Sequence, residues 1–324
     1  MKTVKSMALV VLVTLAILVP LSAHAEEGGS GHYMPGANAS FIDTLPGKPG
    51  LGIGNFFNYY DGNASATAQL PFGGLIAGNL DATSYADTVV VLYQTPLKLL
   101  GGDYAVGVAI PYIWLEVKGD VRVTGPAGNT VTRNRTENTN GIGDITLYPF
   151  MISWTALNRD LKYDVRLGVY APTGDYDKGN LANVGKNYWT FEPTVSVSYF
   201  SSKIGLELTA FAGLDFNTEN DDTNYQSGTQ FHLDVTAAQH LPLWGGIAGV
   251  GANFFYYQQI EGDSGSGATL GSFKGRTIGI GPVVSYIMKV WQHDLAAELK
   301  WLPEIDVGNR LKGDSIWFKL AMAF

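Results

Sequence analysis

Hydrophobic and polar side chains alternate along many stretches of this chain. Between residues 161 and 170 the odd-numbered positions, from Leu161 to Val169, are apolar, whereas the even-numbered positions include Lys162, Asp164 and Arg166. Residues two apart share one face of a strand, so this pattern predicts a β-strand with one apolar and one polar face. The segments do not show the 3.6-residue period of an amphipathic helix. The same division recurs at 203–217, 229–240 and 294–301.

About twelve such segments can be recognised, and they are long. Their lengths of 10–16 residues exceed the about five or six residues that are usual for strands of soluble sheets, and they match those of tilted membrane-spanning strands. The predicted strands span roughly 50–61, 85–97, 103–118, 141–154, 160–171, 187–200, 203–217, 228–241, 245–259, 275–289, 292–302 and 315–324.

The connections between these segments alternate strictly between short and long. Short gaps lie near 98–102, 155–159, 201–202, 242–244 and 290–291. Long gaps, rich in Gly, Asn, Asp and Thr, lie near 62–84, 119–140, 172–186, 218–227, 260–274 and 303–314. Outer-membrane barrels have short periplasmic turns and long external loops in this order. The sequence therefore predicts an all-β fold, a transmembrane antiparallel β-barrel of about 12 strands, whose last strand alternates from Ile316 to the terminal Phe324.

Composition is consistent with this fold and excludes several other classes. Only 15% of the 324 residues are charged, against about 25% in ordinary soluble domains, and 46% are hydrophobic. The absence of cysteine removes disulfide scaffolds and thiolate metal sites. A net charge of −8, spread along the chain, does not indicate a nucleic-acid partner.

The chain divides into three parts. Residues 1–25 read as a signal peptide, with two lysines, an apolar run and an Ala23-His24-Ala25 cleavage site. Residues 26–48 do not alternate and are expected to form a periplasmic or plug segment, and residues 49–324 the barrel. We therefore predict export to the outer membrane of a Gram-negative bacterium. The expected partners are membrane lipid and the outer-membrane assembly machinery, while the oligomeric state stays open.

If the apolar positions face lipid, the opposite positions place charges of both signs in the barrel interior. These charges either pair for structural reasons or form a polar channel wall or ligand network. The candidate lumen-lining residues are Lys162, Asp164, Arg166, Glu192, Lys203, Glu207, Asp215, His232, Asp234, Glu298, Lys300 and Lys319. Three aromatic residues of a long loop, Tyr176, Tyr188 and Trp189, are candidates for contact with an entering ligand.

Signals for catalysis, metals and cofactors are weak. His232 and Asp234 share a face, but no serine stands at the spacing expected of a barrel hydrolase. No histidine spacing suggests a metal site, and the acidic run 219–222 lacks the ligand spacing of a calcium loop. Gly-x-Gly repeats are not followed by helices. We therefore expect no enzyme activity, no metal and no cofactor.

Three stretches resemble a known family. GHYMPG at 31–36, GIGDITLYPF at 141–150 and YAPTGDYDKGNLANVGKNYWTFEP at 170–193 are similar to exported β-barrel proteins labelled as the meta-pathway of phenol degradation. The resemblance implies an outer-membrane transporter of hydrophobic compounds. That family is similar in plan to channels for fatty acids and aromatic hydrocarbons, which implies an N-terminal hatch at 26–48.

These observations together predict an outer-membrane channel or transporter for small, hydrophobic or aromatic molecules. About twelve strands lie between the 8-stranded barrels that side chains fill and the 16-stranded open porins, so a narrow or plugged lumen is expected. Two alternatives remain: a structural or adhesion barrel with a closed lumen, and a surface hydrolase. The sequence does not identify the substrate.

Overall fold

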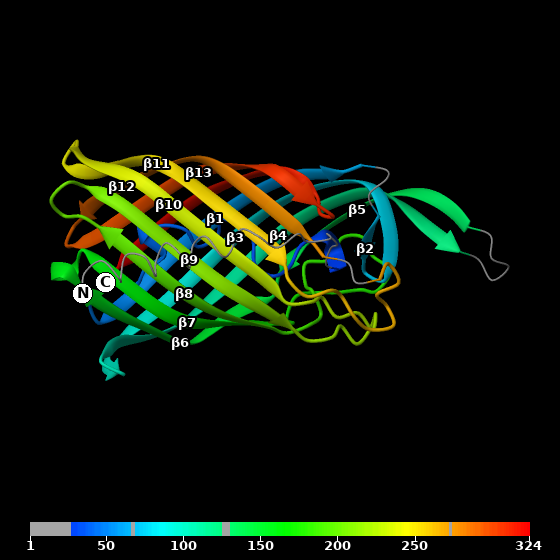
Figure 1. The fold of residues 1–324 in the computed structure, drawn as a ribbon, viewed down its shortest axis with the longest axis horizontal. Helices are drawn as coiled ribbons and strands as arrows, with labels where there is room; N and C mark the ends of the chain where they lie inside the picture. Colours follow the sequence, from blue (N-terminus) through cyan, green and yellow to red (C-terminus); the bar gives the residue numbers. More distant parts are fainter. Residues whose placement is uncertain (1–26, 66–68, 125–129, 272–273) are drawn as a thin grey trace, which may run out of the picture.

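The computed structural model describes residues 27–65, 69–124, 130–271 and 274–324, so the predicted signal peptide lies outside the described residues. These residues form one antiparallel sheet of fourteen strands (Figure 1). The strands are β1 (Gly50–Ala64), β2 (Leu70–Phe72), β3 (Leu75–Leu99), β4 (Gly102–Thr124), β5 (Thr130–Ile142), β6 (Ile145–Ala156), β7 (Leu161–Ala171), β8 (Thr190–Phe200), β9 (Leu206–Asn217), β10 (Gln230–Leu243), β11 (Gly246–Gln259), β12 (Arg276–Val290), β13 (His293–Gly308) and β14 (Lys312–Ala323). Three short 3-10 helices are η1 (Glu27–Gly29), η2 (Phe41–Asp43) and η3 (Leu157–Arg159).

The sheet closes into a barrel because its first long strand pairs with its last. β1 pairs with β14 from Gly52 opposite Ala323 to Asn63 opposite Lys312, and on its other side it pairs with β3. The short β2 adds to β3, and β5 adds to β4, outside the closed ring. Twelve strands therefore form the barrel, which confirms the predicted fold class. Closure pairs the backbone groups of every strand, as a membrane-spanning sheet requires.

The strands also extend beyond the predicted segments at the end of the barrel that carries the long loops, here called the long-loop end. β3 already begins at Leu75, and β4 continues to Thr124 and forms a hairpin with β5. The predicted long loop at 303–314 is wrong, because β13 and β14 leave only residues 309–311 between them. Strands that project beyond lipid meet water on both faces. Their polar residues then pair without the alternation that identifies a strand in the sequence.

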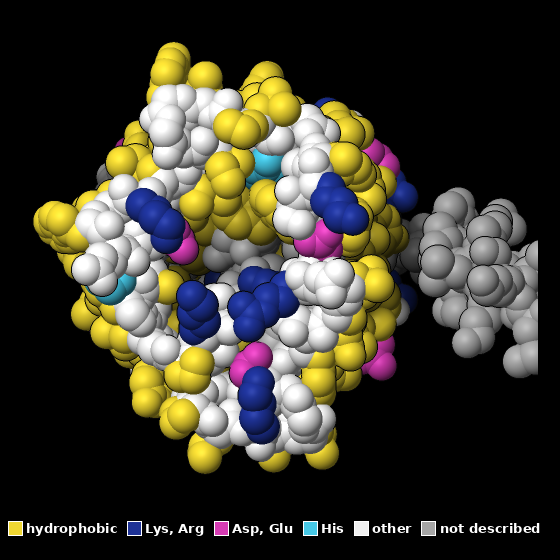
Figure 2. Space-filling model, turned by 90° about the vertical axis from the view of Figure 1, so that its left-hand side faces the viewer, with side chains coloured by type: hydrophobic (Ala, Val, Ile, Leu, Met, Phe, Trp, Pro, Cys, Tyr) yellow, Lys and Arg dark blue, Asp and Glu magenta, His cyan; other side chains and the backbone are white. Residues whose placement is uncertain are grey.

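The opposite end, here called the short-turn end, carries both ends of the barrel sequence and the tight turns (Figure 1). Two turns begin with Trp244 and Trp291, whose side chains are 89% and 88% exposed and whose φ angles are positive. Figure 2 shows this end, with hydrophobic side chains around its rim and lysine and arginine side chains around a central recess. Exposed aromatic residues at this level are typical of the interface girdles of membrane barrels.

The outer wall is apolar and the inner wall is polar. On β8, Val195 and Val197 are more than half exposed, whereas the alternate Thr194 and Ser196 are buried. The same alternation follows most of β9 and β10. A surface of exposed valine, leucine and isoleucine is what a lipid-facing barrel presents. No helix among the described residues is long and apolar enough to span a membrane.

Candidate functional site

Residues 27–49, here called the N-terminal segment, run through the barrel from the long-loop end to the short-turn end. Near the long loops, the Glu27 carboxylate accepts hydrogen bonds from Asn220 and Thr223. At the other end, the Gly47 amide donates to Gln94 at 2.9 Å. Tyr33, between them, is almost fully buried. The segment therefore occupies part of the interior along the barrel axis (Figure 1, dark blue).

The middle of the segment is held by Asp43. Its carboxylate accepts hydrogen bonds from Lys319 Nζ at 2.6 Å and from the Ala39 amide at 2.8 Å. Its carbonyl oxygen accepts one from Arg166 at 3.1 Å. Burial alone would raise the pKa of Asp43, but the positive charges of Lys319 and Lys300 hold this pKa below its usual value. A charged, fully paired carboxylate thus fixes the segment to the wall.

A second attachment joins the segment to a long loop through His32. The ring Nε2 lies 2.8 Å from Asp144 Oδ2, and Nδ1 lies 2.7 Å from Thr190 Oγ1. Burial lowers the pKa of His32 despite the neighbouring carboxylate. Asp144 also accepts hydrogen bonds from the amides of Gly174 and Lys186. One carboxylate therefore ties the N-terminal segment to the loop at 172–189.

Most predicted lumen-lining residues are buried and lie on six strands. Lys162 is half-buried on β7, and the buried ones are Asp164 and Arg166 on β7, Glu192 on β8, Glu207 and Asp215 on β9, His232 and Asp234 on β10, Glu298 and Lys300 on β13, and Lys319 on β14. Lys203 does not line the interior. It lies exposed in the turn at 201–205, because the alternation of β9 continues by chance into turn residues.

Several of these charges pair with one another. Arg166 makes two hydrogen bonds of 2.9 Å to Asp164, and His240 Nε2 lies 2.8 Å from Glu207 Oε2. Lys300 Nζ lies 3.6 Å from Glu298. Buried pairs of this kind offset the cost of removing each charge from water.

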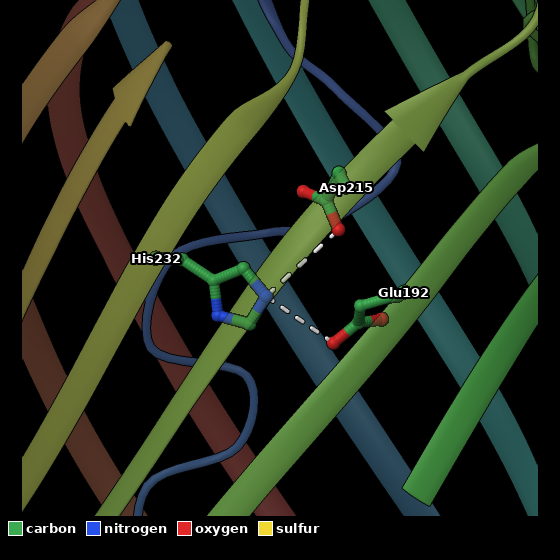
Figure 3. A group of neighbouring side chains, drawn as sticks. All are labelled: Glu192, Asp215 and His232. Carbon is green, nitrogen blue, oxygen red and sulfur yellow. Dashed lines mark ion pairs between the residues drawn. The ribbon is translucent and has the colours of Figure 1, made fainter. Parts of the chain in front are cut away.

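A different group lies on β8, β9 and β10. His232 Nε2 lies 3.3 Å from Glu192 Oε1 and 3.8 Å from Asp215 Oδ1 (Figure 3). Its Nδ1 lies 3.8 Å from Asp234 Oδ2. The ring of Tyr33 stacks on that of His232 with centroids 3.6 Å apart, and the Tyr33 hydroxyl donates to Asp234. Here a single imidazole is surrounded by three carboxylates.

The three predicted loop aromatics have different environments. The Tyr176 hydroxyl lies 3.4 Å from Glu27, and Tyr188 is buried with its ring edge-on to that of His32. Trp189 is 42% exposed and shares its parity with Phe191, which is equally exposed on the outer face of β8. Trp189 therefore faces outward and is not placed to meet a ligand in the interior. We assigned Trp189 to the loop from the sequence, but the inward-outward alternation of β8 already applies to it, and this directs its side chain outward.

The part of the interior that the N-terminal segment leaves open lies beside β1, β3, β4 and β6. It is a cavity of about 560 Å³, with walls that are mainly apolar. Its lining includes Phe56, Val90, Leu92, Ile113, Leu115 and Met151. A smaller cavity of about 130 Å³ lies nearer the long loops and shares Met34, Ser84 and Leu115 with the first. The two cavities therefore adjoin along one side of the segment.

Sequence reasoning missed this apolar inner wall, although a signal was present. The run from Val89 to Leu92 on β3 is apolar at odd and even positions alike, and so on both faces of the strand. In the structure Val89 faces outward, whereas Val90 and Leu92 line the larger cavity. A strand that is apolar on both faces has both faces away from water. Such a run in a barrel strand thus indicates an apolar interior at that point.

Comparison with solved structures identifies the same architecture elsewhere. The crystal structure of an outer membrane channel from Pseudomonas putida F1 has a TM-score of 0.59 and 16% sequence identity, covering 90% of this chain and 100% of that chain. The β domain of the Bordetella autotransporter BrkA has a TM-score of 0.46 and 13% identity, covering 86% and 100%. At this identity the first likeness concerns the fold. No curated protein matches the sequence.

The sequence also matches a family model. The family is described as "Putative MetA-pathway of phenol degradation", and the match extends over residues 60–320, from the end of β1 into β14. Because this match covers most of the chain, the chain belongs to that family.

Proposed function

We propose that this chain is an outer-membrane channel that passes small hydrophobic or aromatic molecules along the apolar side of the N-terminal segment. The main evidence for this proposal is the cavity of about 560 Å³, which lies between that segment and the apolar wall of β3 and β4. Ligand pockets for small molecules are typically about 300–1,000 Å³ and mainly apolar. The cavity therefore has the volume and lining of a site for one small hydrophobic molecule.

The division of the interior supports this route. The segment is attached by charges to Arg166 and Lys319, on the polar side, whereas the residues that face it across the cavity are Val90, Leu92 and Ile113. A hydrophobic solute loses its contact with water by entering the apolar side, and it displaces no ion pair there. The Pseudomonas putida protein with the same fold is an outer membrane channel, which agrees with this proposal.

The lining also holds a few polar groups, which suits a ligand with one polar substituent. Lys162, Arg166 and Lys186 all touch the larger cavity. Each already donates a hydrogen bond to a carbonyl oxygen of the N-terminal segment, from Lys162 to Leu45, from Arg166 to Asp43 and from Lys186 to Ser30. A hydroxyl or carboxylate on the ligand would compete with the segment for these donors, which connects binding to release of the segment.

We infer that the protein performs no chemistry. Thr190, His32 and Asp144 follow one another at hydrogen-bond distance, as a nucleophile, base and acid would. However, Thr190 is fully buried, and its hydroxyl donates to Asn217 at 2.6 Å and not to the histidine. A nucleophile needs access to substrate and a proton directed at its base. The arrangement therefore positions the N-terminal segment.

Filling the cavity tests the proposal. Ala86→Phe and Ala109→Phe add rings to the apolar wall, because both alanines line the larger cavity. We expect each to lower by at least about tenfold the affinity of the full-length barrel in detergent for a fluorescent aromatic probe such as naphthalene. A tenfold loss of affinity corresponds to about 1.4 kcal/mol. Uptake of the probe by intact cells that express each variant should fall in parallel.

Val197→Phe is the matched control, because Val197 lies on the outer face and is more than half exposed. It adds similar volume outside the barrel and should leave binding and uptake unchanged. Wild-type protein that neither binds the probe nor increases its uptake would contradict the proposal and favour a structural barrel. Equal losses in all three variants would also contradict it.

A further inference from the structure

A cluster of metal-ligating side chains lies inside the barrel, on three adjacent strands. Glu192 of β8, Asp215 of β9 and His232 of β10 are each at least 98% buried, and their side chains converge on one point (Figure 3). We propose that these three residues bind one divalent transition-metal ion, with zinc as the first choice. One imidazole nitrogen with two carboxylate oxygens is a donor set that zinc accepts, and a fourth position stays available.

The separations of the donor atoms fit such an ion. Zinc lies about 2.0–2.2 Å from nitrogen and oxygen ligands, so two ligands of a tetrahedral ion are about 3.3–3.5 Å apart. Glu192 Oε1 is 3.3 Å and Asp215 Oδ1 is 3.8 Å from His232 Nε2, and donor atoms of the three residues all lie within 4.8 Å of one another. Small rotations of the two carboxylates bring all three donors to binding distance.

The buried polar groups of the cluster indicate that a ligand fits here. His232 is 1% exposed, and its ring nitrogens face carboxylates at 3.3–3.8 Å without a hydrogen bond of good geometry among the described residues. The amide of Gln230, on the same face of β10 and directly opposite Asp215, also lacks a hydrogen bond at both atoms. Buried polar atoms without partners are rare and costly, and an ion is one accepted cause. A metal would bind the imidazole nitrogen and could take the Gln230 oxygen as a fourth ligand.

Gly213 provides the space that this arrangement needs. It is paired with His232 on one side and with Thr194 on the other, so it separates β10 from β8 at this level. A Cβ atom at this position would lie 2.3 Å from His232 Nε2 and 2.9 Å from Thr194 Oγ1. Because Gly213 has no side chain, the imidazole can lie across β9 and reach a carboxylate two strands away.

Neutral hydroxyl and amide groups orient the carboxylates around His232. Glu192 accepts hydrogen bonds from the hydroxyls of Tyr170 and Thr194, at 2.6 and 2.9 Å. Asp234, next to the cluster, accepts hydrogen bonds from the Tyr33 hydroxyl and the Gly36 amide. All of these donors are neutral. Such outer contacts fix ligand orientation at metal sites.

Zinc binding by the full-length folded barrel in detergent tests the proposal. After treatment with a chelator and dialysis, we expect the wild-type protein to bind one zinc ion per chain in equilibrium dialysis, with the metal quantified by mass spectrometry. Removing a group that only hydrogen-bonds to a metal ligand weakens metal binding roughly 10- to 100-fold. His232→Ala removes a ligand itself, so it should weaken zinc binding by more than this. Cobalt in place of zinc should give the visible absorption of a four-coordinate ion.

His240→Ala is the matched control, because His240 is similarly buried on the same face of β10 but, among the residues that the structure describes, pairs with Glu207 alone. It should bind zinc as the wild type does. Glu192→Gln and Gly213→Ala supply further variants if His232→Ala fails to fold, and both should also lose the ion. Wild-type protein without stoichiometric zinc, or equal zinc binding by the wild type and all three cluster variants, would overturn the proposal.

Discussion

The ion pair between Asp43 and Lys319 offers the most direct test of how the N-terminal segment is held. Lys319 Nζ lies 2.6 Å from the Asp43 carboxylate, and both side chains are about 99% buried or more. Asp43→Ala removes this pair together with the hydrogen bonds from the Ala39 and Ser40 amides. The barrel strands keep their own pairing, so the change should act on the attachment of the segment and leave the fold of the barrel intact.

The size of the effect follows from the burial of Lys319. Removing one partner of a buried ion pair costs about 3–5 kcal/mol, because the remaining charge is left in a poorly hydrated place. Lys319 retains the Ala37 carbonyl and, at 4.0 Å, the Glu298 carboxylate, which places the expected cost near the lower limit. Since about 1.4 kcal/mol corresponds to a factor of ten, the detached fraction of the segment should rise roughly 100-fold.

Limited proteolysis measures this fraction, because a protease reaches the segment only when it leaves the barrel interior. The cleavage rate within residues 27–49 should rise with the detached fraction, and single-channel conductance in a planar bilayer should become larger or more frequent. Asp306→Ala is the control: Asp306 pairs with Arg276 at 2.6 Å on an exposed site, where a pair contributes at most about 1 kcal/mol. Cleavage and conductance of a folded Asp43→Ala barrel that equal those of this control would refute the reasoning.

Three further predictions concern the attachment of the segment and the outer wall. Positive charges hold the pKa of Asp43 below its usual value, and hydrogen bonds from His32 and two backbone amides do the same for Asp144. The contribution of both carboxylates is therefore complete above an ordinary carboxyl pKa and is lost as pH falls through the lowered one. Because burial also lowers the pKa of His32, detachment becomes easier as pH falls below about 6.5, so cleavage should begin to rise there and rise further below about pH 4. Glu27→Ala removes the acceptor for the Asn220 and Thr223 side chains, and should speed amide hydrogen exchange in residues 218–229 in line with a loss of about 1–3 kcal/mol. Val197→Lys should destabilise the barrel toward urea in lipid by about 2–4 kcal/mol if the site lies at the bilayer midplane, and unchanged unfolding would contradict the lipid-facing assignment.

The fold could be predicted from the sequence because lipid imposes a pattern on each strand separately. A strand such as β8 must place Val195 and Val197 outside and small polar residues inside, and this period of two is visible without knowledge of any neighbour. Beyond the lipid the constraint ends, and there the prediction fails: β5 and the outer part of β13 are paired strands in polar or mixed sequence. The limits of the prediction therefore coincide with the limits of the apolar surface.

The interior could be predicted only as a list of side chains, because strand register decides which of them meet. Asp215 is opposite Gln230, and Gly213 is opposite both Thr194 and His232, so the residue that lets His232 approach Glu192 stands on a third strand. No spacing within one segment reveals that convergence. The position of the N-terminal segment is equally nonlocal, since Asp43 is 276 residues from Lys319. By contrast, the apolar run Val89 to Leu92 was a local signal, because it breaks the period of two that strands such as β8 keep. In a barrel of this kind, the strand that loses its polar face marks the side of the lumen open to an apolar solute, and the polar strands mark the side to which the segment is attached.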